Sequence, residues 1–167
     1  MMVCSEHGSM RKKITGRQHT EPGGPSEQGW LDLQQIASVE VTSEDPRFPV
    51  EGAFGAPDGP GWRASQPGEQ QIRIVFDEPV PLRRIHLRFH EPEFERTQEF
   101  TLRWRPAGGG PAREIVRQQW NFSPTGSTTQ IEEYAVHLEA VSVLELAIRP
   151  DVGRPDAVAS LASMRLG

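Results

Sequence analysis

Four arginines lie close together in the sequence, two on each side of a glycine-rich turn at residues 108–110. They are Arg103, Arg105, Arg113 and Arg117. If the flanking segments form a β-hairpin, the side-chain period of two places several guanidinium groups on one face. Guanidinium groups bind carboxylates and paired hydroxyls through forked hydrogen bonds. The pattern predicts either a ligand-binding face or a solvated face on which the arginines pair with Glu99, Glu114 or Glu133.

Trp120 and Asn121 follow these arginines where the expected strand ends. An aromatic ring can stack on the C–H face of a sugar while an amide and arginines bond its hydroxyls. Trp62 and Arg63 form a second such pair. The alternative for either tryptophan is a packing role at the end of a sandwich. We predict that the ligand site combines these residues with Arg103, Arg113 and Arg117.

Catalytic and metal-binding patterns are weak. Glu91, Glu93 and Glu95 are candidate carboxylates, but a glycosidase needs two of them roughly 5 to 9.5 Å apart, with one pKa raised. Their segment EPEFER has the character of an exposed connection without an apolar pocket. The sequence also contains no Ser-His-Asp order, Walker loop or metal-spaced Cys/His set. We therefore expect a non-enzymatic protein, and a glycoside-active enzyme is the weakest of the functions considered.

Alternation of apolar and polar residues indicates an all-β fold. It predicts eight short strands, at residues 39–41, 70–76, 84–90, 98–105, 114–120, 132–138, 143–148 and 160–166. Turn signals separate them, and no segment has a convincing amphipathic-helix pattern. This arrangement is typical of an antiparallel β-sandwich or jelly roll. We expect a disordered leader at residues 1–29, rich in Gly, Pro, Ser and charge, and one domain at residues 30–167.

Charge and cysteine content restrict the possible partners and compartment. The net charge is -5 and the pI is about 5.6, so a general nucleic-acid or anionic-membrane surface is not expected. Only two of the 18 basic residues are lysines, and both lie in the predicted leader. The single cysteine, Cys4, allows no intrachain disulfide. With no apolar secretory signal and no long apolar run, we expect a cytoplasmic protein.

Short motifs in this chain resemble the galactose-binding-like β-sandwich superfamily. They are Trp62 to Ser65 after a long loop, Asp77 to Leu82 at a turn, Ile85 to Phe89 in a strand, and the closing segment Ala159 to Gly167. The superfamily includes discoidin domains, coagulation-factor type C domains and many carbohydrate-binding modules. The resemblance covers residues 37–167 and implies an eight-stranded antiparallel jelly-roll sandwich.

The resemblance also implies functional expectations. Many members hold a structural calcium ion with the help of an acidic residue on the last strand, but Ser163 occupies the matching position here. Asp58 could remain a ligand, although Ca²⁺ prefers six or more oxygens. We expect a non-catalytic module that recognises a carbohydrate or related polyhydroxylated ligand. The alternative is a cytoplasmic protein-interaction scaffold that turns the same arginine face towards an acidic protein partner.

Overall fold

The computed structural model describes residues 11–14, 17–19, 29–56 and 58–167 of the chain. Most of the predicted disordered leader, residues 1–29, lies outside the described residues. Two of its described stretches form strands β1 (Arg11–Ile14) and β2 (Arg17–His19), and β1 pairs in parallel with the next strand, β3 (Ala37–Val41). The rest of the described chain forms the predicted β-sandwich.

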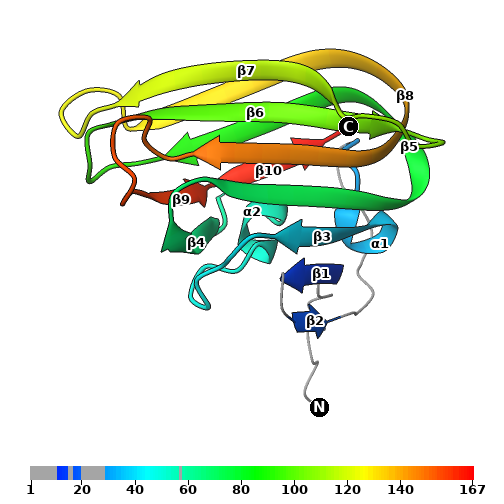
Figure 1. Ribbon diagram of the computed structural model, residues 1–167, viewed down its shortest axis with the longest axis horizontal. Helices are drawn as coiled ribbons and strands as arrows, with labels where there is room; N and C mark the ends of the chain where they lie inside the picture. The colour runs from blue at the N-terminus through cyan, green and yellow to red at the C-terminus, as the bar shows by residue number, and fades with distance from the viewer. Residues whose placement is uncertain (1–10, 15–16, 20–28, 57) are drawn as a thin grey trace.

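The sandwich is built from strands β3 to β10, and its pairings are antiparallel. The further strands are β4 (Trp62–Pro67), β5 (Gln70–His90), β6 (Arg96–Pro106), β7 (Arg113–Phe122), β8 (Thr129–Arg149), β9 (Val158–Leu161) and β10 (Ser163–Leu166). The larger sheet has the order β2-β1-β3-β5-β8-β6-β7, with β10 added beside β5, while β4 and β9 pair separately. These elements give the layered arrangement visible in Figure 1. The predicted jelly-roll class is confirmed.

Strands β5 and β8 each pass through both layers of the sandwich. The sequence predicts separate strands at 70–76 and 84–90, but β5 is continuous and bends where its register with β8 shifts between Val75 and Arg84. Pro79 and Pro81 lie in this bend, and prolines cannot donate to a ladder. The first half of β5 pairs with β3 and its second half with β10. The strands predicted at 132–138 and 143–148 likewise join as β8.

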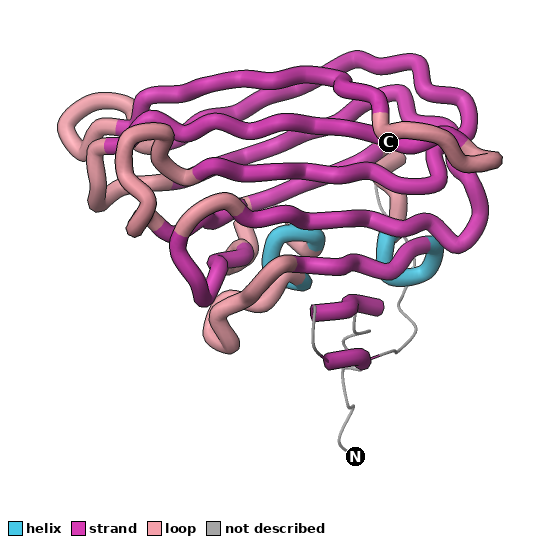
Figure 2. Tube along the Cα trace, viewed as in Figure 1, coloured by secondary structure: helices cyan, strands magenta, loops and turns pink. Residues whose placement is uncertain are grey.

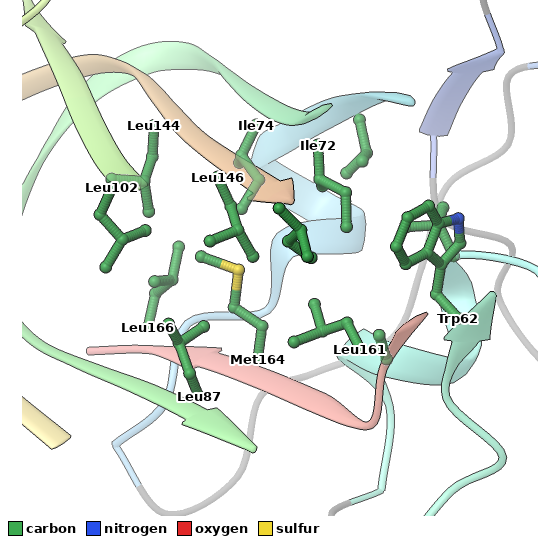
Figure 3. Packing of buried hydrophobic residues seen from close by; sticks show 14 of the residues in the cluster. Trp62, Ile72, Ile74, Leu87, Leu102, Leu144, Leu146, Leu161, Met164 and Leu166 are labelled. Carbon is green, nitrogen blue, oxygen red and sulfur yellow. The ribbon is translucent and has the colours of Figure 1, made fainter. Parts of the chain in front are cut away.

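The core lies between the layers and contains the inward residues of both halves of β5 and β8. Figure 3 shows Ile72, Ile74 and Leu87 of β5 packed near Leu144 of β8 and Met164 of β10. Two short helices, α1 (Leu33–Ile36) and α2 (Glu51–Phe54), lie in connections before β3 and β4. In the part of the chain that the structure describes, no helix has the length and apolar character needed to cross a membrane.

Three connections gather at one end of the sandwich, which we call the loop end. They are residues 91–95, 123–128 and 150–157, at the left of Figure 1, while the glycine-rich turn at 107–112 lies at the opposite end. Figure 2 shows the same separation as loops at both ends of long strands. Gly61 precedes β4 and lies close to the backbone of β9: it has φ +76°, and a Cβ there would lie 2.8 Å from the Leu161 carbonyl oxygen.

Candidate functional site

A pocket of about 330 Å³ lies at the loop end. This volume is within the range of small-molecule sites, roughly 300 to 1,000 Å³. The connection between β5 and β6, the connection between β8 and β9, and strand β4 supply its wall. The lining residues are Arg63, Glu91, Phe94, Glu95, Arg96, Asp151, Arg154, Asp156, Ala157 and Val158. We refer to it as the loop-end pocket.

Arg96 is a buried cation in the wall of this pocket. Its side chain is 6% exposed and that of Glu91 is 5% exposed, and Nη2 of Arg96 lies 4.0 Å from Oε2 of Glu91. Nη1 donates to the Val158 carbonyl oxygen at 2.9 Å, whereas Nε has no hydrogen-bond partner in the described residues. Burial lowers the pKa of Arg96, and nearby Glu91 partly opposes that shift. The guanidinium therefore has hydrogen-bonding capacity that the described protein groups do not fill.

Phe94 supplies an exposed aromatic surface beside this cation. Its side chain is 60% exposed. The loop that carries it is held in place, because the Phe94 N–H donates to Oε1 of Glu91 at 3.2 Å. Glu91 in turn donates its own backbone N–H to the Thr128 carbonyl oxygen at 2.8 Å. An exposed ring on an anchored loop is suited to contact an apolar ligand face.

The remaining wall of the pocket mixes positive and negative side chains. Arg63 on β4 is exposed, and its guanidinium lies 5.5 Å from the centre of the Phe48 ring. On the opposite connection, Asp151 accepts a hydrogen bond from the Gly153 N–H at 3.0 Å, which orders the turn that carries Arg154. The lining contains three arginines and four carboxylates. The pocket therefore offers many hydrogen-bonding groups without a strong field of one sign.

The predicted site residues are divided between two faces of β6 and β7. Arg103, Arg117 and Asn121 lie on the outer face, because their positions in the β6–β7 register alternate with those of the core residues Phe100 and Leu102. Arg117 pairs with Glu99 at 3.8 Å and with Glu114 at 3.4 Å, and it is half exposed. Asn121 accepts a hydrogen bond from the Thr97 hydroxyl at 2.7 Å. The glutamate-paired alternative therefore describes Arg117 correctly.

The other predicted residues face elsewhere. Trp120 belongs to the inward face of β7 and packs against the core, so it does not share a surface with Arg117 and Asn121. Arg113 lies 5.4 Å from the centre of the Trp104 ring, near the end of the sandwich opposite the loop end. Trp62 is 1% exposed and its indole donates to the Ser43 carbonyl oxygen, so it is a packing residue. Among the predicted site residues, only Arg63 lines the loop-end pocket.

Sequence reasoning missed Phe94, Arg96 and the connection at 150–157. One signal was available: Arg96 and Gln98 have the same strand parity as the core residues Phe100 and Leu102, so both had to face inwards. The strand that the sequence predicts begins at Gln98, so Arg96 is expected in a loop. The sequence also predicts that EPEFER is an exposed connection, but Glu91 is only 4% exposed, so this expectation is wrong for Glu91. The contact between the connections at 91–95 and 150–157 could not be predicted from the local sequence pattern of either one.

The residues at the position of the implied calcium ion do not fit that ion. Ser163 is 1% exposed, and its hydroxyl oxygen has no hydrogen-bond partner among the described residues. A serine cannot replace the carboxylate that helps to hold calcium in related folds. Within the described ranges, no group of three or more His, Cys, Asp or Glu residues is placed to hold a metal.

Solved structures with a similar fold are carbohydrate-binding modules. The family 32 module of C. perfringens NanJ, in complex with galactose, has a TM-score of 0.61 and 12% identity over 82% of this chain and 96% of that one. CpGH89CBM32-5 from Clostridium perfringens, in complex with GalNAc-β-1,3-galactose, has a TM-score of 0.59 and 15% identity over 83% and 99%. The family 32 module of AlyQ, in complex with 4,5-unsaturated mannuronic acid, has a TM-score of 0.58 and 14% identity over 84% and 98%.

These similarities establish the fold of the chain. No family model matches the sequence, and no curated protein sequence matches it. The structural matches nevertheless extend over most of this chain and nearly all of each module. The chain therefore has the galactose-binding-like β-sandwich fold, as the resemblance in its motifs implies.

Proposed function

We propose that this protein is a non-catalytic carbohydrate-binding module and that the loop-end pocket holds the saccharide. One observation carries the proposal: the pocket places the exposed ring of Phe94 beside a lining of arginine and carboxylate groups. A pyranose has an apolar C–H face and a rim of hydroxyls, and the ring and the charged lining complement these two parts. The similar modules that carry galactose, a galactose-containing disaccharide or an uronic acid support this class of ligand.

The mixed charge of the pocket favours a neutral saccharide. Three arginines could attract an acidic sugar, but four carboxylates line the same space. A neutral sugar can accept hydrogen bonds from arginines and donate to carboxylates through each hydroxyl group. An acidic sugar would place its own carboxylate among Glu95, Asp151 and Asp156 and would be repelled by them.

A glycan array tests this function with the full chain. We expect retention of neutral galactose-type or glucose-type glycans and weaker retention of uronic-acid glycans of equal length. Thermal-shift measurements with the retained glycan should then show a higher Tm, because a ligand that binds only the folded state stabilises it. Retention of no glycan in either class would contradict the proposed function. Preferential retention of uronic acids would leave the function standing and reject the neutral specificity.

A further inference from the structure

Polar atoms without a protein partner are concentrated behind the wall of the loop-end pocket. Seven buried side-chain nitrogen and oxygen atoms have no hydrogen-bond partner in the described chain. Five of the seven belong to one region of β6, β7 and β8: Nε of Arg96, Oε1 and Nε2 of Gln98, Nε1 of Trp120 and Oε1 of Gln130. The residues Gln98 and Gln130 are 1% and 0% exposed, so bulk solvent does not reach them.

The strand register places these side chains together. Gln98 lies directly opposite Trp120, and Arg96 lies directly opposite Phe122 one inward step closer to the loop end. Across the sandwich, Gln118 donates to Glu132. Trp120 lies two residues closer to the loop end than Gln118 on β7, and Gln130 lies two residues closer to it than Glu132 on β8. Trp120 therefore faces Gln130. We call Gln98, Trp120 and Gln130 the interior polar layer.

Rearranging the amides does not satisfy this layer. Exchanging the oxygen and nitrogen of Gln98 changes nothing, since neither atom has a partner. The Gln130 amide has a fixed orientation, because its Nε2 donates to Oε1 of Glu132 at 3.0 Å and an oxygen there would be repelled. The layer therefore needs hydrogen-bonding groups from outside the protein.

A dry layer is energetically implausible. Each buried donor or acceptor left without a partner loses its hydration without compensation, and five such losses would be comparable with the whole free energy of unfolding of a single domain. Buried waters commonly resolve this problem where a site has two to four polar partners. The layer has one indole donor, one complete amide and one amide oxygen, which is a set suited to water.

We propose that the interior polar layer is a buried water site and that its water also accepts the free Nε–H of Arg96. The water then joins the wall of the loop-end pocket to the interior, and it completes the hydrogen bonding of the guanidinium that borders the pocket. The water site does not depend on a bound saccharide, and the experiments that test it do not measure saccharide binding. A negative result for the water site is therefore distinguishable from a negative result for the proposed function.

Water-selective NMR on the ¹⁵N-labelled full chain tests the site at the Trp120 indole N–H. The signal can be assigned by its loss in Trp120→Phe. We expect a cross-peak with water that has opposite signs in the NOE and ROE experiments, as a long-lived bound water gives. Trp62 is the matched control, because its buried indole already donates to the Ser43 carbonyl oxygen at 3.1 Å. A Trp120 indole that shows no water contact, like that of Trp62, would overturn the proposal.

The variant Gln98→Met provides a second test whose sign depends on hydration. If the layer is hydrated, losing the amide removes support for the water and lowers Tm, by roughly 2–4 °C for a chain of this size. If the layer is dry, the same change removes two unsatisfied polar atoms and raises Tm. A higher Tm would contradict the buried water site even if the NMR assignment failed.

Discussion

Strands β6 and β7 carry polar side chains on both faces, but these side chains differ between the faces in solvent exposure and in the partners they have. On the outer face Arg117 is half exposed and has two glutamates within 4 Å. On the inner face Arg96 is almost fully buried and has one ion-pair partner at 4.0 Å, and its Nε has no partner among the described protein groups. The outer ion pairs contribute little in solvent, whereas the buried guanidinium has lost its hydration. The two faces of this strand pair thus place an arginine side chain in very different surroundings.

The largest predicted contrast is in stability. Arg96→Met leaves Glu91 buried without its counter-ion, and we expect the free energy of unfolding to fall by about 3 kcal/mol. Arg117→Met removes exposed pairs and should change it by about 0.5 kcal/mol or less. Urea denaturation at neutral pH measures both variants. Equal effects would contradict the distinction between the two faces.

The next contrast concerns the pKa of Tyr134, which lies on the inner face of β8. Burial, with the negative charge and hydrogen bond of Glu132, raises the pKa of Tyr134 to about 12. Because the folded state holds this proton more tightly, the contribution of Tyr134 to stability is complete below pH 10 and is lost as the pH rises through about 12.

Tyrosinate absorbance measures this shift for one residue, since Tyr134 is the only tyrosine in the chain. We expect a midpoint near pH 12 and a lower midpoint in Glu132→Gln. Circular dichroism must show that the fold persists over the titration. A midpoint near pH 10 in the folded protein would mean that the inner face is as open to solvent as the outer one.

A smaller effect is expected on saccharide affinity at the rim of the pocket. Phe94→Ala should weaken binding of the retained glycan about tenfold, through loss of roughly 1.5 kcal/mol of ring contact. Ile131→Ala is the matched control, because Ile131 is 59% exposed and does not line the pocket. Isothermal titration calorimetry measures both. Equal affinities for the two variants would remove Phe94 from the site.

The smallest effect is expected on the outer face that the sequence first suggested. Arg117→Ala and Asn121→Ala should leave saccharide affinity within about twofold, because their side chains already bond Glu99, Glu114 and Thr97. The same calorimetric titration applies. Loss of binding in either variant would move the site from the loop-end pocket to the outer face.

The sequence predicts the fold better than the site, for physical reasons. Alternation identifies inward residues such as Ile72, Ile74 and Leu87 because burial acts on each strand separately. The joining of two predicted strands into β5 depends on pairing with β8, which local alternation does not record. The site depends on contacts between residues that are still further apart in the sequence, such as Phe94 and Asp151. The cluster of arginines near one turn is conspicuous in the sequence, but none of its four members lines the loop-end pocket, and Arg105 and Arg117 form ion pairs with glutamates.

The most direct test of the central claim is an NMR titration of the ¹⁵N-labelled chain with galactose and with GalNAc-β-1,3-galactose. The loop-end pocket predicts saturable shifts of the backbone amides at residues 94–96 and 151–158. Binding in this pocket should cause no comparable shifts at residues 113–121, except where the end of β7 contacts the loop end. Shifts concentrated at residues 113–117 would contradict the account. So would the absence of shifts both with these two sugars and with every glycan that the array retains.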